Sequence, residues 1–474
     1  MSLVRAVEVP RRPAYRLEPV IGASRFGRLA GAADRLRQVL AGRSIWHVNS
    51  AAAVGGVAEV LQALVGYGQD LGIPVGWLVI SGDAGFFAIT KRLHDQIHGI
   101  LTGAPLGAAE QRHYARMLAA DAVELVARVR PGDVVLLHDP QTAGLAAPLA
   151  QAGARVVWRC HIGVEWEDEV TRAGWEFLRP HLAAAEAYVF SRRDYVPPWI
   201  PAGKTWIIRP SIDPFSPKNQ PLDTGTVRAI MVKLGLLDDA APAAPATFVR
   251  RDGDVDMVTR PAVVIGGGRP GPGDPVLVQV SRWDRLKDMA GVMRGFADHV
   301  VPGGPGYLLL AGPAVTGLSD DPESAAVYGE CLLQWRDLPP AARARTLLVT
   351  LPLEDIDENA VMVNALQRHA TVIVQKSLAE GFGLTVLEGM WKGRPVIGSA
   401  VGGITRQIVE GTGILLADPA DLEAFGSAAR LLLGDPDRAA RMGQAAQAHV
   451  REHYLWDLQL FRYGRLLAAL MAAG

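Results

Sequence analysis

The sequence of 474 residues lacks several features, and each absence excludes a class of protein. Only Cys160 and Cys331 are present, so no disulfide framework is possible, and we expect a reducing, cytoplasmic setting. The formal net charge of -1 argues against general binding of nucleic acid or of a membrane surface. No apolar run approaches the roughly 20 residues of a membrane span, and residues 1–20 lack the apolar core of a signal peptide.

Metal-binding patterns are also missing. The sequence has no cluster of cysteines and histidines at metal-ligand spacing, and no Asp-x-Asp pair in a clear strand context. We therefore predict no metal site and no other cofactor. The remaining composition, 49% hydrophobic and 20% charged, is that of a globular protein, and the chain is too long for one core.

Strand and helix patterns alternate through both halves of the chain. Short apolar runs typical of buried parallel strands are each followed by a helical pattern, and we expect an α/β fold of two doubly wound, Rossmann-like domains. We place the first domain at residues 1–270, including a linker or insert over about 217–270 that is rich in Ala, Pro and Gly. The second domain covers residues 271–453, and a terminal helix follows at 454–474.

The most informative stretch is residues 375–403, QKSLAEGFGLTVLEGMWKGRPVIGSAVGG. Two adjacent strand–helix units each place a glycine turn before a helix, and such turns let a ligand approach the backbone and the N–H groups of the helix start. Glu380 lies in the first turn and Glu388 about two helical turns later, so both carboxylates can face one crevice. Taken alone, the pattern also fits an ordinary turn with two solvated glutamates.

The spacing of these glutamates around a Gly-Phe-Gly turn resembles the signature of retaining, nucleotide-sugar-dependent glycosyltransferases of family 4. With NALQRHA at 364–370, the run is more similar still to glycosyltransferring trehalose synthases and to trehalose phosphorylases. The resemblance covers about residues 40–470. It implies the GT-B fold, with two domains facing across a cleft and a terminal helix that crosses back to the first domain.

The resemblance also implies a donor site for a nucleoside diphosphate glucose. In the family the first glutamate and the turn amides hold the transferred sugar, and the second glutamate holds the ribose of the nucleotide. Two fixed cations near a helix start suit a diphosphate, and a glycine turn near residue 55 faces the phosphates. The predicted donor contacts are Gly55, Gly56, Arg282, Lys287, Glu380, Gly381, Phe382, Gly383, Leu384, Thr385 and Glu388.

Candidate acceptor residues lie in the first half. From the residues alone, positions 82–94, GDAGFFAITKRLH, are better read as a solvated helix face. The segment is similar to one of the trehalose-forming branch, and that resemblance makes Asp83 and Lys91 candidate acceptor contacts. His138 with Asp139, and His161, each follow a predicted strand, where open α/β sheets bind ligands. By resemblance, His161 borders the transferred sugar and the other two face the acceptor.

The implied reaction is transfer of glucose to free glucose, giving trehalose with the anomeric configuration retained. We predict that Glu380, Arg282, Lys287 and His161 are catalytic, and that the departing phosphate, rather than a protein nucleophile, draws the proton from the acceptor. Glu380 acting as a covalent nucleophile is the alternative mechanism. The expected partners are a sugar nucleotide and a sugar acceptor, with no nucleic acid and no membrane insertion, and a homodimer is a further expectation.

Three other functions fit the same features. A trehalose phosphorylase would use these sites with inorganic phosphate. A family 4 transferase acting on another acceptor fits because Val54 stands where trehalose synthases usually have glycine and Arg285 where they usually have proline. A non-enzymatic sugar-binding protein is a third reading, against which the combined presence of the charged residues named above argues.

Overall fold

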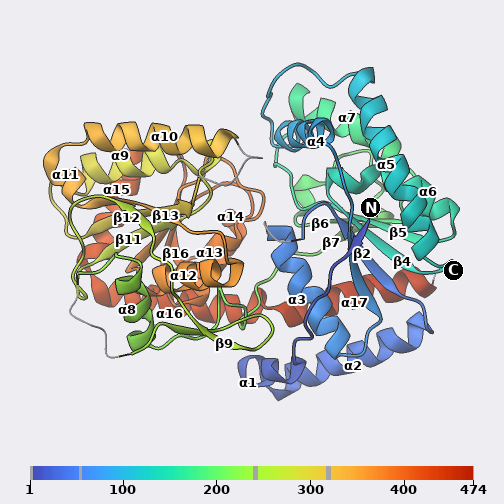
Figure 1. Cartoon of the computed structure of the whole chain (residues 1–474), viewed down its shortest axis with the longest axis horizontal. Coiled ribbons are helices and arrows are strands. Elements are labelled where there is room, and N and C mark those ends of the chain that lie inside the picture. The colour runs from blue at the N-terminus through green and yellow to red at the C-terminus, as the bar shows by residue number, and fades with distance from the viewer. Residues whose placement is uncertain (1–3, 53–55, 239–243, 316–321, 473–474) are drawn as a thin grey trace. The chain divides into compact units, whose positions relative to one another are not determined.

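The computed structural model describes residues 4–52, 56–238, 244–315 and 322–472. The chain forms two compact units, each a layered α/β structure (Figure 1). The first unit comprises Met1–Ser211 and Tyr454–Gly474, and the second comprises Ile212–His453. The α/β class predicted from the sequence is confirmed.

A seven-stranded sheet forms the centre of the first unit, in the order β1-β3-β2-β4-β5-β6-β7. Its strands are β1 (Arg5–Ala6), β2 (Ile45–Asn49), β3 (Val75–Val79), β4 (Val134–His138), β5 (Arg155–Arg159), β6 (Ala187–Phe190) and β7 (Thr205–Ile207). Only β1 is antiparallel to its neighbour; the other pairs are parallel. All five residues of β4 are buried, as expected for a parallel sheet covered on both faces.

Helices cover both faces of this sheet (Figure 1). One group consists of α4 (Ala84–Ile97), α5 (Ala108–Arg128), α6 (Ala146–Gln151) and α7 (Glu169–Leu182). The other consists of α1 (Glu18–Ile21), α2 (Ala23–Leu40), α3 (Gly56–Asp70) and α17 (Trp456–Ala472). The terminal helix α17 packs along α2, and the Asp457 carboxylate accepts two hydrogen bonds from the Arg25 guanidinium at their contact.

The second unit has its own seven-stranded sheet, in the order β10-β13-β12-β11-β14-β15-β16. Its strands are β10 (Val263–Ile265), β11 (Val276–Val280), β12 (Tyr307–Pro313), β13 (Thr346–Leu351), β14 (Val372–Gln375), β15 (Val396–Ser399) and β16 (Gly413–Leu416), with a separate hairpin of β8 (Thr247–Val249) and β9 (Val255–Met257). Its helices are α8 (Thr224–Lys233), α9 (Met289–His299), α10 (Pro322–Asp337), α11 (Pro340–Ala344), α12 (Ile356–His369), α13 (Leu384–Trp391), α14 (Ile404–Gln407), α15 (Leu422–Gly434) and α16 (Pro436–His453).

Each sheet has one point where its strand order reverses. In the first unit the chain leaves β2 for β3 on one side and later adds β4 on the other; in the second unit, β12 and β14 flank β11 in the same way. The loops that follow the two central strands leave on opposite faces at such a point and create a crevice at the carboxyl ends of the strands. The sites described below lie there.

The boundary between the units differs from the predicted position near residue 270. The segment from residue 212 onwards belongs to the second unit, because α8 packs against α12 and β10 pairs with β13. Ion pairs of Arg250 with Asp355 and of Arg260 with Glu358 tie the β8–β9 hairpin region to α12 as well. Composition could not reveal this, since the short strands depend on partners about 100 residues away.

Candidate functional site

In the second unit, two loops bring Lys287 and Glu380 together at the reversal point. Lys287 ends the short 3-10 helix η5 (Arg285–Lys287) after β11, and Glu380 lies in the loop after β14. The Lys287 Nζ atom donates to Glu380 Oε2 at 2.6 Å, and the two side chains are only 15% and 12% exposed. The Ser377 hydroxyl lies 3.4 Å from the same oxygen. A cation and a carboxylate are thus held side by side at the carboxyl edge of the sheet.

A second ion pair ties the same two loops beneath the first. Lys376 is completely buried, contacts the Asp288 carboxylate, and donates to the Pro419 carbonyl at 2.6 Å. Asp288 directly follows Lys287, has a left-handed backbone with φ of 47°, and caps α9 by accepting from the Gly291 amide at 3.0 Å. This pair was not predicted from the sequence, although a lysine directly after a buried strand was a usable signal.

The glycine turn before α13 is interlocked with the turn before α14. Gly383 has φ of 87° and caps α13 without a side chain, so the backbone N–H groups of Leu384 and Thr385 begin the helix. A Cβ atom at Gly403 would lie 2.3 Å from the Phe382 carbonyl oxygen, and that oxygen accepts from Gln407 Nε2 at 2.6 Å. The turn therefore has a fixed backbone conformation, with a helix start directly behind it.

The other predicted donor residues have separate partners. Glu388 is buried, 3% exposed, and one of its oxygens lies 3.7 Å from Lys218 Nζ. Arg282 is 58% exposed and its guanidinium contacts Asp284 at 3.1 Å. Their partners, Lys218 and Asp284, differ from the two residues of the Lys287–Glu380 pair. Gly56 begins α3 in the first unit, whereas Gly55 lies outside the described residues.

In the first unit, three histidine rings form a continuous chain. His47 Nδ1 lies 2.9 Å from His138 Nε2, and His138 Nδ1 lies 3.0 Å from His161 Nε2. The first ring belongs to β2, the second ends β4, and the third follows β5, so neighbouring strands deliver them to one edge. His138 and His161 were predicted from the sequence, but His47 was not, because it lies within its strand rather than at the end.

Burial disfavours the charged form of all three rings. Burial lowers the pKa of His47 to about 3. Burial also lowers the pKa of His138 and of His161 well below the usual histidine value, and the nearby Arg159 guanidinium adds to that effect. Within the residues described, no group of three His, Cys, Asp or Glu side chains is arranged to hold a metal ion. The ring nitrogens lie at hydrogen-bonding distances, so the three rings can form a hydrogen-bonded line.

Asp139 lies beside this line. Its backbone φ is 62°, and its Oδ1 atom accepts a hydrogen bond from the His161 amide at 2.7 Å. Burial raises the pKa of Asp139 to about 7, while the hydrogen bond and the charge of Arg159 act in the opposite direction. Arg159 is fully buried and donates to the Ile208 carbonyl at 2.7 Å and to Ser191 Oγ at 3.1 Å.

The two remaining acceptor candidates lie on α4 with partners of their own. Asp83 caps the helix by accepting from the Phe86 amide at 2.7 Å and pairs with His113 at 2.8 Å. The amide hydrogen bond and the His113 contact lower the pKa of Asp83. Lys91, 49% exposed, pairs with Asp95 at 3.1 Å one turn further along. These contacts account for both residues structurally, and their acceptor role stays a prediction.

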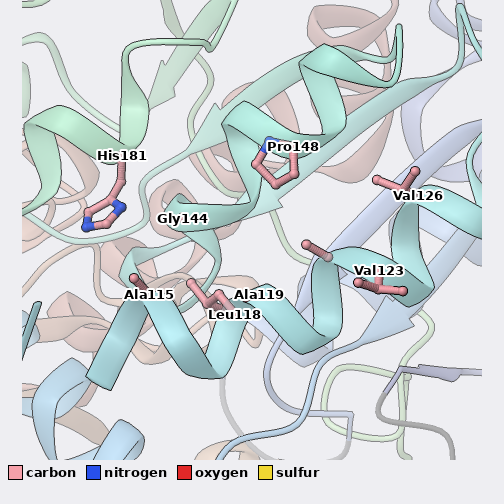
Figure 2. Close-up of a pocket in the computed structure, with 9 residues that line it drawn as sticks. Ala115, Leu118, Ala119, Val123, Val126, Gly144, Pro148 and His181 are labelled. Carbon is pink, nitrogen blue, oxygen red and sulfur yellow. The ribbon is translucent and has the colours of Figure 1, made fainter. Parts of the chain in front are cut away.

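A pocket of about 550 Å³ opens elsewhere on the first unit (Figure 2). Its walls come from α5 and from the segment around α6, with His181 of α7 at one side. The lining residues are Ala115, Leu118, Ala119, Ala122, Val123, Val126, Gly144, Pro148 and His181. None of the predicted site residues lines it, and the lining is almost entirely apolar. Separately, no helix in the described part of the chain has the length and apolarity to cross a bilayer.

Comparison with known proteins adds family matches in both units. Residues 47–197 match the family described as trehalose synthase, N-terminal domain, and residues 358–449 match glycosyl transferases group 1. The trehalose synthase of Rubrobacter xylanophilus is 32% identical over 93% of this chain and 94% of its own length. The trehalose synthase of Pyrococcus horikoshii is 33% identical over 99% of each chain.

More distant similarities agree with the fold. A trehalose phosphorylase from Pleurotus pulmonarius is 25% identical over 91% of this chain, which spans 57% of that protein. The solved trehalose-phosphate synthase (UDP-forming) of Burkholderia vietnamiensis superposes with a TM-score of 0.65 at 15% identity, covering 91% of this chain and 99% of that one. The predicted GT-B fold is confirmed by this likeness.

Proposed function

We propose that this chain, which belongs to the trehalose synthase family of glycosyltransferases, moves glucose from a nucleoside diphosphate glucose to free glucose to form trehalose. Family membership establishes a hexosyltransferase with trehalose-related chemistry. The donor, the acceptor and retention at the anomeric carbon are the proposed parts. The observation that supports them best is the Lys287–Glu380 pair at the reversal point of the second sheet.

The donor would bind to the second unit at this pair. A diphosphate carries at least two negative charges, and a mostly buried lysine attracts such an anion more strongly than a solvated one does. When Lys287 turns to the phosphate, Glu380 becomes available to accept hydrogen bonds from sugar hydroxyls. The N–H groups at the start of α13 would add fixed dipoles for the sugar or phosphate oxygens.

The leaving group would gain most from this arrangement. Breaking the bond between C1 and the phosphate oxygen places further negative charge on the diphosphate, which Lys287 and Arg282 stabilise more in the transition state than before it. The acceptor hydroxyl attacks from the same face, and the departing phosphate takes its proton. Glu380 then orients the sugar, and no covalent bond to the protein forms.

Glu388 would contribute to nucleotide binding. Its buried carboxylate lies beside Lys218, and a carboxylate held in place by a neighbouring cation can accept hydrogen bonds from the two ribose hydroxyls. In the first unit, His161 would contact the transferred sugar and Asp139 the acceptor. His138, predicted from the sequence as an acceptor contact, is 1% exposed and has both ring nitrogens against His47 and His161, so it would act through His161. Asp83 and Lys91 would contribute to acceptor binding only if they exchange their present partners for it.

A product assay tests the proposal directly. The purified chain is incubated with glucose and with ADP-, UDP- or GDP-glucose in turn, with and without inorganic phosphate, and products are read by NMR. Trehalose with an equal amount of nucleoside diphosphate is the expected result, and the spectrum also reports the anomeric configuration. Glucose 1-phosphate formed from trehalose and phosphate, without turnover of any sugar nucleotide, would instead identify a trehalose phosphorylase. Donor consumption without a disaccharide would contradict the free-glucose acceptor.

A further inference from the structure

The order of the atoms in the histidine chain carries more information than the proximity of the rings. Both contacts join Nδ1 of one ring to Nε2 of the next, so the three rings are connected head to tail. We propose that His47 and His138 are positioning residues that fix the tautomer of His161 and thereby decide whether its remaining nitrogen donates or accepts a hydrogen bond. The proposal rests on the proposed function for the role of His161 at the sugar.

A neutral imidazole has one N–H and one acceptor nitrogen. If His47 donates from Nδ1, His138 must accept at Nε2 and so carries its proton on Nδ1. It then donates to His161 Nε2, which leaves His161 protonated on Nδ1 as well. If the direction is reversed, all three rings carry the proton on Nε2. The chain therefore permits two states, and in each of them the three rings share one tautomer.

A charged ring would break this rule, because an imidazolium donates from both nitrogens. The surroundings oppose such a charge. The rings are held by buried β-strand ends, the fully buried Arg159 guanidinium contributes positive charge nearby, and Tyr463 packs edge-on against His47 at 6.3 Å between ring centroids. Asp139 is the acidic group at the line, and it is bonded to the His161 backbone amide.

One nitrogen of the chain remains for the substrate. His161 Nε2 faces His138, so Nδ1 is the atom left to meet a sugar hydroxyl. In one state of the chain it donates, and in the other it accepts. Sugar hydroxyls can do either, so the choice is made by the protein, and reversing it requires all three rings to exchange protons together. The opposite end of the line, at His47, lies against Tyr463 of α17.

Nitrogen NMR on the full-length wild-type chain with ¹⁵N-labelled histidine tests the rule, and substitutions serve only to assign the signals. Nitrogen shifts distinguish the two neutral tautomers from the imidazolium, and spectra of single-histidine variants assign the rings. We expect His47, His138 and His161 to be neutral near pH 7 and to share one tautomer. Opposite tautomers at His47 and His161, or a charged ring among the three, would overturn the inference whatever the product assay shows.

A variant connects the rule to turnover. His138→Phe keeps a ring at the centre of the line but removes both of its nitrogens, so we expect the tautomers of His47 and His161 to become independent. Because small misplacements of reacting groups cost up to about 100-fold, kcat should fall by about 10- to 100-fold while the donor KM changes less than twofold. The control is His181→Phe, a first-unit histidine outside the line, whose Nε2 lies 2.9 Å from Gln111 Oε1. It should leave kcat unchanged.

The outcomes test the positioning role of His138 and the proposed function separately. An unchanged kcat in His138→Phe would overturn the positioning role, and an equal loss in the His181→Phe control would reduce the effect to general damage and also overturn it. A wild-type chain that forms no trehalose from any donor would contradict the proposed function. The tautomers could still be measured on that chain, and the prediction that the three rings share one tautomer would be tested independently of activity.

Discussion

Replacing Lys287 tests the assignment of the diphosphate to the second unit. In Lys287→Met the side chain keeps nearly its length but loses the charge that lies 2.6 Å from Glu380. Two unit charges about 4 Å apart interact by about 4 kcal/mol at an effective dielectric constant of about 20. Part of this attraction already exists before the bond breaks. We therefore expect a loss of about 2–3 kcal/mol of transition-state stabilisation, or about 30- to 160-fold in kcat/KM.

The assay is initial-rate release of nucleoside diphosphate with glucose as acceptor. A matched control is Arg285→Met in the same 3-10 helix, because that arginine is 59% exposed and pairs with Glu330 on the surface. It should change kcat/KM less than twofold. Thermal unfolding of both variants checks that the fold is intact, since the substitution leaves Glu380 without its closest cation. A kcat/KM for Lys287→Met within threefold of the wild-type value would refute the reasoning.

Three further substitutions test separate parts of the structure. Glu388→Ala should raise the donor KM by about tenfold or more with little change in kcat, because a hydrogen bond to a charged group contributes about 1.5–3 kcal/mol. Steady-state kinetics with varied donor concentration measures this change, and an unchanged KM would show that the ribose contact is wrong. Gly403→Ala should lower the free energy of unfolding in urea by about 1–3 kcal/mol and lower kcat/KM, because the new Cβ would lie 2.3 Å from the Phe382 carbonyl oxygen. In the control Gly434→Ala, the new Cβ has no atom within 4 Å, so the substitution should be neutral. Equal effects of the two substitutions would contradict the interlocked turns. Burial raises the pKa of Asp139 from 3.8 to about 7. Between these pH values the folded state holds a proton that the unfolded state has already lost. The free energy of unfolding should therefore fall as the pH rises, by up to about 1.4 kcal/mol per pH unit. In Asp139→Asn this fall should be smaller between pH 4.5 and pH 7, and identical pH profiles of the unfolding free energy would show that the carboxyl group is not shifted.

The pairing of Lys287 with Glu380 also bears on how the site behaves before the donor arrives. Two oppositely charged side chains that neutralise each other avoid the cost of a buried, unpaired charge. The donor must then supply contacts to both groups at once: an anion for the lysine and hydroxyl donors for the carboxylate. A ligand that offers only one of these, such as free phosphate or free glucose, would contact only one of the two charged groups.

Local patterns determined the α/β class and most strand positions. Buried parallel strands are short apolar runs, and a glycine turn before a helix marks where a ligand can approach, so residues 375–403 indicated the α/β fold and a candidate ligand site. The assignment of that site to a sugar-nucleotide donor came from the family resemblance and stays a prediction. The motif residues there were identified because they are close in sequence. The position of the boundary between the units was not identified from the sequence, because β10 and the β8–β9 hairpin depend on partners in β13 and α12.

The tertiary structure alone decided which side chains meet. Lys287 and Glu380 are 93 residues apart in the chain, and Lys376 reaches Asp288 across 88 residues. Both contacts form because β11 and β14 are neighbours in the sheet, although β12, β13 and several helices lie between them in the chain. His47 gave no local signal, since a histidine inside a strand is usually a satisfied core residue. It belongs to the histidine chain only because β2, β4 and β5 lie side by side, and a sequence does not state the order of strands in a sheet.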